Sequence, residues 1–384
     1  MTSRLACGLC AGLLACPVSL ACTIFVATEG DTTLVGNNED FYPPGPTIWV
    51  RPATESRYGW IGFGFERNYP RYPQGGVNEH GLFFDWASLP KKRDDVRFPS
   101  DRPFFNTYSP VKMLEECATV AEAIALYSSY NERIFRRSHI IIADKYGDSA
   151  IIEWGKDQLA IIPGTGSYQL LTNFNITDPQ LAGGYPCRRY TIADRMLAQG
   201  DVSVERFVSI LKAVHQRGRY RTQYSNIYDL KNGVIYVYHE HYYYEHIAMT
   251  VADETARHAH CYELPSLFAR MEMLLPADGE TTTSTTVTFQ WKGLGREYLL
   301  YCWTDPGFVG CTPVTVRSPG LVGDCGASPT TAPSMSSSGT AAKHEMAATI
   351  ESLEPNTQYY WKLVAKGSQG IDCESVVKTF TTGQ

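Results

Sequence analysis

The stretch "PVSLACTIFVATEGDTTLVGNNEDF", residues 17–41, decides the fold. Apolar and polar residues alternate over residues 22–36, and Glu29-Gly30-Asp31 divides this segment into two halves. A period of two is typical of a half-buried strand, and a glycine between charged residues is typical of a turn. The stretch therefore predicts two strands joined by a tight turn, with Cys22 at the start of the first strand.

The residues before Cys22 have the pattern of an export signal. One charged side chain is followed by an apolar run from Leu5 to Leu20, which is too short to span a membrane. The small residues Ser19 and Ala21 stand three and one positions before Cys22, where a signal peptidase requires them. We therefore expect residues 1–21 to be a signal peptide and the mature protein to be exported, to the periplasm or out of the cell.

A second interpretation makes Cys22 the lipid-anchored residue of a lipoprotein. A lipoprotein box needs an apolar residue three positions before its cysteine, and Ser19 stands there instead. A rival box is Leu13-Leu14-Ala15-Cys16. Such an anchor would attach the protein to a membrane or cell surface, and it would block the amine of Cys22. The two interpretations therefore exclude each other.

Composition excludes several classes of protein. The chain has 384 residues, enough for one large and one small domain, and its hydrophobic content of 43% is ordinary for a globular protein. A net charge of −6 provides no basic field for nucleic acid. His239 and His241 alternate on one predicted strand, but no third ligand has recognisable spacing. We therefore expect no metal, no cofactor and no nucleic-acid partner.

Strand and helix patterns follow one another along the chain in blocks. Residues 42–76 read as a loop rich in tyrosine, proline and glycine. Thr119 with Glu122 forms a capping box that divides the helical pattern of 109–130. The other predicted elements are a turn and strand at 75–90, a hairpin with a third strand at 138–162, helices at 186–200 and 203–216, and a strand pair at 223–249. Strands, then helices, then strands predict a layered α+β fold.

The last quarter of the chain has a different composition. A threonine-rich, all-β pattern begins near residue 277, and "IESLEPNTQYYWKLVAKG", residues 350–367, resembles the fibronectin type III signature. We expect a small all-β sandwich over 276–384, with Trp291 in its core. Four cysteines in this region allow two disulfides whose pairing the sequence leaves open: Cys302, Cys311, Cys325 and Cys373.

Cys22 acquires a distinct chemistry if the chain is cut before it. The free α-amine has a pKa of about 7.7–8 and can act as a general base near neutral pH. One residue then carries both the nucleophile and its base, so a catalytic histidine is not needed. Such a site does need partners that hold the amine and donors for an oxyanion.

Six segments in order resemble the N-terminal nucleophile amidases of the choloylglycine hydrolase and penicillin acyltransferase type. The first pairs Cys22 with Asp40, eighteen residues later, in "GNNEDF". The others are "GGVNEHGLFFDWASLP", "HIIIADKYGDSAIIEWGKDQLAII", "LLTNFNITDP", "CRRYTIADRML" and "TQYSNIYDLKNGVIYVYHEHYYYE". The resemblance spans 22–250 and implies a four-layer αββα sandwich over 22–275.

The resemblance also implies roles. Cys22 would attack an amide carbonyl, Asp40 would hold its amine, and Asn173 would orient the amine or donate to the oxyanion. Ser88 falls where bile-salt hydrolases have an oxyanion-hole asparagine, and a loop hydroxyl is its alternative interpretation. Asn37 stands where bile-salt and penicillin V hydrolases have an arginine. The acyltransferase branch tolerates a neutral amide there, so the resemblance favours that branch. A late arginine of the family has three possible counterparts, namely Arg217, Arg219 and Arg221.

The expected activity is hydrolysis of a linear, non-peptide amide, with a small acyl amide as the partner. Loops at 42–74 and 91–108 are the expected pocket walls, and family members are often homo-oligomers. An acyltransferase is the nearest alternative, because it differs only in the second nucleophile. A third alternative is an inactive, lipid-anchored binding protein of the cell surface.

Overall fold

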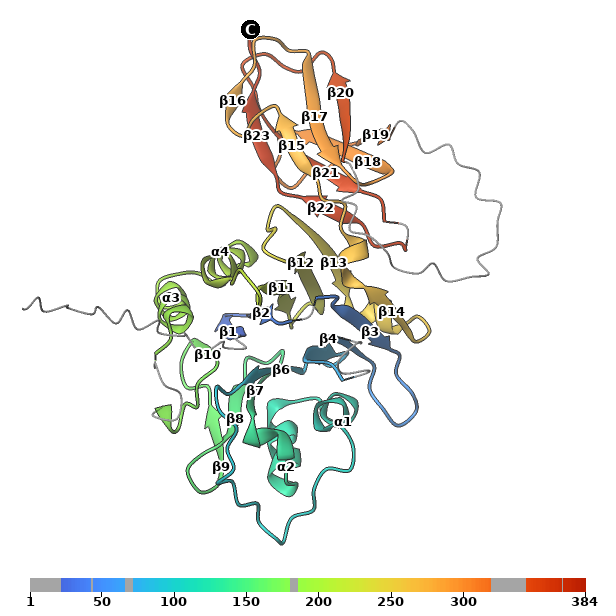
Figure 1. Ribbon diagram of the computed structural model, residues 1–384. Coiled ribbons are helices and arrows are strands. Elements are labelled where there is room, and N and C mark those ends of the chain that lie inside the picture. The colour runs from blue at the N-terminus through green and yellow to red at the C-terminus, as the bar shows by residue number, and fades with distance from the viewer. Residues whose placement is uncertain (1–21, 43, 66–71, 180–185, 319–342, 368) are drawn as a thin grey trace, which may run out of the picture.

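The computed structural model describes residues 22–42, 44–65, 72–179, 186–318, 343–367 and 369–384. The predicted signal peptide, residues 1–21, lies outside the described residues, as do Cys325 and the run 327–340. The described chain contains two large, mainly antiparallel sheets, with helices on their outer faces and a β-rich part at the C-terminal end (Figure 1).

The first sheet contains both strands that the opening stretch predicts. Its strands from β10 to β13 are β10 (Tyr168–Leu171), β1 (Thr23–Glu29), β2 (Thr32–Asp40), β11 (Thr222–Asp229), β12 (Val234–His239) and β13 (Glu245–Thr250). Gly30 forms the turn between β1 and β2 with φ of 57°, a left-handed conformation that favours glycine. The strand pair predicted at 223–249 is confirmed as β11 and β12, and β13 extends it.

The second sheet corrects one prediction. Its strands, in order, are β14 (His260–Glu263), β3 (Thr47–Arg51), β4 (Trp60–Gly64), β5 (Gly75–Asn78), β6 (Phe83–Ser88), β7 (Ser138–Ala143), β8 (Ser149–Trp154) and β9 (Leu159–Pro163). The segment 42–76, predicted as a loop, therefore contains β3 and β4. The hairpin and third strand predicted at 138–162 are confirmed as β7, β8 and β9.

Two glycines explain why β4 was missed. A Cβ atom on Gly62 would lie 2.7 Å from Cβ of Pro73, and one on Gly64 would lie 2.9 Å from the ring of Trp49. Both glycines therefore allow close packing across a strand, where their composition suggested a turn.

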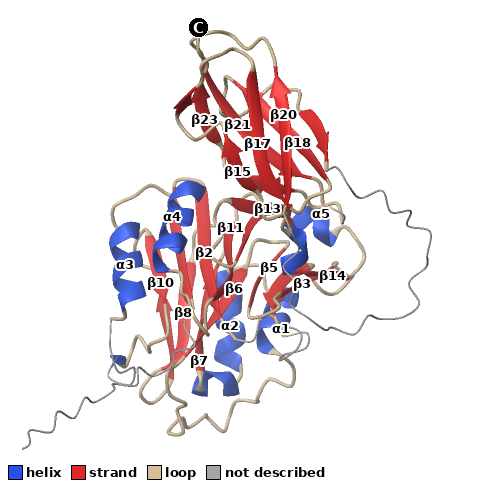
Figure 2. Ribbon diagram, turned by 45° about the horizontal axis from the view of Figure 1, so that its top comes forward, coloured by secondary structure: helices blue, strands red, loops and turns tan. Residues whose placement is uncertain are grey.

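Helices cover the outer faces of both sheets (Figure 2). Helices α3 (Arg188–Leu197) and α4 (Val204–Val214), both predicted, contact strands of the first sheet, whereas α1 (Ser109–Glu116) and α2 (Val120–Ser129) contact strands of the second. Thr119 caps α2 by accepting a hydrogen bond from the Glu122 N–H, so the predicted break is confirmed. The short helices are α5 (Val251–Thr255), η1 (Arg133–Arg136) and η3 (Leu264–Leu267).

The largest apolar core lies between the facing sheets. Ile24 and Val35 of the first sheet share this core with Phe63 and Phe83 of the second. Side chains at alternate positions of β1 and β2 point into it, because successive residues of a strand face opposite sides. Cys22 belongs to the same core, directly before β1.

Main-chain pairing joins the C-terminal strands to the first sheet. Glu245 and Ile247 of β13 pair with Ser375 and Cys373 of β22 (Cys373–Ser375). The sheet continues through β21 (Gln358–Ala365), β18 (Glu297–Trp303) and β19 (Val314–Arg317), with β23 (Lys378–Thr381) and β16 (Glu280–Thr281) off this path. A third sheet contains β15 (Glu272–Leu275), β17 (Val287–Gly293) and β20 (His344–Ile350).

Two predictions for this region have different outcomes. Trp291 is fully buried in β17, as predicted for a core tryptophan. The predicted disulfides are absent among the described cysteines, because Cys302, Cys311 and Cys373 are all free. Cys373 instead donates from its thiol to Glu245. The fibronectin resemblance and the boundary at 275/276 stay predictions.

The contact between β1 and β2 can be tested at Gly36. A Cβ atom there would overlap the ring of Phe25, which is fully buried. Gly36→Ala is therefore expected to lower the free energy of unfolding by about 1–3 kcal/mol, measured by urea denaturation. Gly166→Ala is the control, since its Cβ meets open space, and should change stability by less than about 0.5 kcal/mol. Equal stability of both variants would contradict the packing described.

Candidate active site

Cys22 lies at the edge of the core, directly before β1. Thr23 pairs with Asn38 of β2, so Cys22 lies beside Glu39. Cys22 is 7% exposed, and its thiol donates a hydrogen bond to Oε2 of Glu39, with 3.6 Å between sulfur and oxygen. Burial raises the pKa of the Cys22 thiol, and the carboxyl groups of Glu39, Asp40 and Asp85 raise it further.

Asp40 is the last residue of β2 and is almost fully buried. Its carboxylate accepts hydrogen bonds from Oγ1 of Thr222 at 2.5 Å and from Nε2 of Gln216 at 2.8 Å. Burial raises the pKa of Asp40 to about 7, although the charge of Arg189 and these two hydrogen bonds oppose the shift. Asp40 therefore titrates near neutral pH.

Arg189, at the start of α3, joins three parts of the site. Its Nη1 donates to the carbonyl oxygen of Cys22 at 2.5 Å and to Oγ1 of Thr23 at 2.6 Å. Its Nη2 donates to Oδ1 of Asn173 at 3.0 Å. One guanidinium thus fixes the backbone of Cys22 relative to Asn173.

The three arginines considered from the sequence have other partners. Arg221 pairs with Glu240, and Arg217 donates to a ring nitrogen of His215. Arg219 stacks over the rings of Tyr42 and Tyr220. Arg189 is therefore the arginine that contacts Cys22 within the described part of the chain.

Asn173 and Ser88 are neighbours. The Asn173 amide donates from Nδ2 to the carbonyl oxygen of Ser88 at 2.8 Å. The contact uses the backbone carbonyl of Ser88, and the oxyanion role of Ser88 stays a prediction. Since Arg189 bonds to both Asn173 and Cys22, these four residues form one hydrogen-bonded group.

Asn37 lies on the same face of β2 as Glu39 and is fully buried. Neither its Nδ2 nor its Oδ1 has a hydrogen-bond partner of ordinary geometry within the described residues, although the amide lies near enough to lower the pKa of Glu39. Asp85 of β6 is fully buried and faces the same core. Burial and the charge of Glu39 raise the pKa of Asp85.

Sequence reasoning missed Arg189, Glu39 and Asp85. The alternation of β2 contained a signal for Glu39, because a residue two positions after Asn37 shares its face. Asp85 carried a signal as the single charge in the apolar strand "FFDWAS". Arg189 lies 167 residues after Cys22 and had no local signal.

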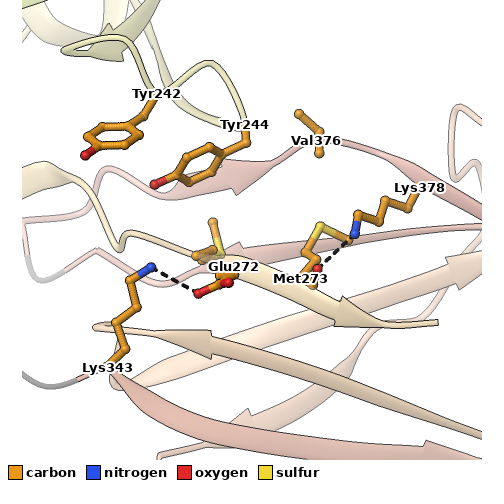
Figure 3. Close-up of a pocket in the computed structure, with 8 residues that line it drawn as sticks. Tyr242, Tyr244, Glu272, Met273, Lys343, Val376 and Lys378 are labelled. Carbon is orange, nitrogen blue, oxygen red and sulfur yellow. Dashed lines mark hydrogen bonds and ion pairs between the residues drawn. The ribbon is translucent and has the colours of Figure 1, made fainter. Parts of the chain in front are cut away.

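A different cavity of about 420 Å³ lies near the C-terminal strands (Figure 3). Tyr242 and Tyr244 form one wall, opposite Glu272 and Met273. Lys343 pairs with Glu272, and the Lys378 ammonium donates to the carbonyl oxygen of Met273. The described residues that line this cavity include no cysteine, serine or threonine. The cavity therefore lacks a nucleophile, whereas the site at β1 has the thiol of Cys22.

The described residues contain no group of three side chains that could hold a metal ion. No helix in the described part of the chain is long and apolar enough to cross a membrane.

The fold resembles that of a known hydrolase. A variant of conjugated bile acid hydrolase from Clostridium perfringens matches with a TM-score of 0.50 and 18% identity, over 63% of this chain and 96% of that chain. Penicillin V acylase from Agrobacterium tumefaciens matches with a TM-score of 0.46 and 19% identity, over 57% and 82%. No family model and no curated protein matches the sequence. The first likeness shows that the described chain shares the α+β fold of that hydrolase.

Asp40→Asn is expected to flatten the pH dependence of stability of the full 384-residue chain. Folding raises the pKa of Asp40 from 3.8 to about 7, so the folded protein retains a proton that the unfolded chain releases. The free energy of unfolding should therefore fall between about pH 4 and pH 7, by ~4 kcal/mol for this group at ~1.4 kcal/mol per pH unit. Urea denaturation across this range measures the slope.

The exposed carboxylate of Asp157 supplies the control. Asp157→Asn should keep the wild-type profile, whereas Asp40→Asn should lose part of its slope. An Asp40→Asn profile as steep as that of the wild type would contradict the buried, proton-retaining state of Asp40.

Proposed function

We propose that this protein is an exported cysteine hydrolase of the N-terminal nucleophile type. Its substrate would be a linear, non-peptide amide, such as an N-acylated amine or amino acid. The observation that carries the proposal is the position of Cys22, directly before β1, with its carbonyl held by Arg189 and its thiol in the buried polar group.

Cleavage before Cys22 would release its α-amine. The neutral amine would take the thiol proton, and the sulfur would attack the amide carbonyl carbon. The α-ammonium would give this proton to the departing nitrogen as the tetrahedral intermediate collapses, which would expel the amine product and leave a thioester on Cys22. Water would then attack the thioester, release the carboxylic acid and restore the thiol.

The surrounding residues have complementary roles in this scheme. Asp40 would hold the α-amine, and Arg189 would fix the Cys22 backbone. Asn173 would orient the amine or donate to the oxyanion, supported by its hydrogen bonds to Arg189 and Ser88. Ser88 and Asn37 stay weaker candidates for direct contact with substrate.

We also propose the finer architecture. The four-layer αββα sandwich over 22–275 is supported by helices on the outer face of each sheet and a core between the sheets. A fibronectin type III-like domain over 276–384 is supported by its strands and by buried Trp291. A homo-oligomer stays a prediction from the resemblance.

Aromatic rings lie together beyond Asp40, and they favour an apolar acyl group as part of this proposal. Phe41 stacks on Phe65 with ring centroids 4.4 Å apart, and Phe65 contacts Tyr224. These rings would form an apolar wall for the acyl chain.

Cys22→Ala is expected to abolish cleavage of a panel of N-acyl amines and N-acyl amino acids, because it removes the attacking sulfur. Release of amine and acid is measured by mass spectrometry, with an added amine to detect acyl transfer. Cys261→Ala is the control, since Cys261 is an exposed free thiol on β14 and should leave activity intact. Retained cleavage in Cys22→Ala would contradict the mechanism, and predominant acyl transfer would favour the acyltransferase alternative.

The mature protein is expected to begin at unmodified Cys22. Intact mass of protein purified from an exporting host tests this, because a free amine requires cleavage before this residue. A diacylglyceryl addition would contradict the proposal and favour the lipid-anchored alternative.

A further inference from the structure

We propose that Glu39 is a second acid–base group of this reaction, which takes the Cys22 thiol proton and returns it to the leaving amine. The inference rests on the proposed function. Glu39 touches a reacting atom, because its Oε2 lies 3.6 Å from the Cys22 sulfur. It lies outside the set of residues that the resemblance assigns to the site.

Strand pairing fixes this contact. The register of Thr23 with Asn38 places Cys22 beside Glu39, and both side chains lie on the face of the sheet that packs against the core. Glu39 is 3% exposed, so bulk water does not compete for its carboxylate. The thiol hydrogen bond therefore persists without competition from solvent.

The charged groups around Glu39 favour a protonated carboxyl group in this cluster. The titratable groups around Glu39 and its neighbour Asp40 come from several elements, and they are Cys22, Asp85, Tyr108, Tyr224, Tyr228 and Arg189. Among the carboxyl groups of Glu39, Asp40 and Asp85, Asp40 is the one whose pKa the charge of Arg189 lowers, and cleavage before Cys22 would add one ammonium. With one carboxyl in excess, the buried cluster favours holding a proton on a carboxyl group.

The pKa of Glu39 lies in the range that proton transfer near neutral pH requires. Burial and the charge of Asp40 raise the pKa of Glu39 to about 8. A general acid–base group is most effective when its pKa lies near the working pH, because both protonation states are then populated. Glu39 meets this condition near neutral pH, as the α-amine also does.

The proposed step uses Glu39 in place of direct transfer to the amine. The S–H bond of Cys22 breaks, its proton passes to Oε2 of Glu39, and the sulfur electron pair forms the bond to the carbonyl carbon. Collapse of the intermediate breaks the C–N bond, and Glu39 gives its proton to the departing nitrogen. Glu39 thereby returns to its carboxylate form.

The test compares two measurements on mature wild type and Glu39→Gln. The first is alkylation of Cys22 by iodoacetamide across pH 5–10, followed at the N-terminal peptide by mass spectrometry. The second is the pH profile of kcat and kcat/KM on an active amide of the panel. Glu245→Gln is the matched control, because Glu245 is also buried and also accepts from a thiol, that of Cys373, outside the site.

Opposite changes are expected in Glu39→Gln. Without the nearby carboxylate, Cys22 should ionise more easily, so the alkylation midpoint should fall by about one pH unit or more. Amidase kcat should fall about 100-fold, within the range for general acid–base catalysis, because the α-amine is then the remaining base. A merely structural role would lower both reactivities together, and Glu245→Gln should keep both profiles.

An unchanged alkylation midpoint, or a wild-type pH profile of kcat/KM, would overturn the proposal. If Glu39→Gln fails to mature, Glu39→Asp replaces it, because the shorter side chain moves the carboxylate away from the Cys22 sulfur. Glu39→Asp should lower kcat about tenfold. An unchanged kcat would then overturn the proposal. If the wild type cleaves nothing on the panel, the proposed function fails. The alkylation midpoint then still supports the proton contact if it falls and overturns it if it does not.

Discussion

The pairing of β1 with β2 is the constraint on which the rest of the site depends. Thr23 opposite Asn38 brings Cys22 beside Glu39 and close to Asp40. The same register directs Ile24 and Val35 into the core, so the apolar packing that stabilises the sheets also holds the nucleophile. A shift by one residue would turn the thiol away from Glu39.

Burying these acids opposes stability. Asp40 and Glu39 lie in a site where burial raises their pKa values, and Arg189 is the cation that opposes the shift at Asp40. Such groups persist when surrounding contacts supply the lost stability, and they are typical of functional sites. The apolar core between the sheets provides those contacts in this chain.

Local patterns predicted much of the fold but little of the hydrogen bonding within the site. The β1–β2 pair and the break at Thr119 follow from alternation and capping, which neighbouring residues determine. Strand β4 was missed because Gly62 and Gly64 serve close packing that only the tertiary structure reveals. Arg189 was missed for the same reason, since its contact with Cys22 depends on how α3 packs against the sheet.

The type of donor distinguishes Glu39 from two other buried glutamates, Glu245 and Glu153. Glu245 accepts from the backbone N–H groups of Arg270 and Met271 as well as from the Cys373 thiol. Glu153 accepts from the N–H groups of residues 176 and 177 and from the ring of His139.

Backbone donors hold both of these carboxylates in one place and act to lower their pKa values, although burial leaves the pKa of Glu245 raised. The hydrogen bond of Glu39 comes from a side chain instead, the thiol of Cys22. The thiol is the group that must lose its proton before the sulfur can attack. Glu39 therefore lies where a buried carboxyl group can exchange a proton with the nucleophile, whereas Glu245 and Glu153 are held by the main chain.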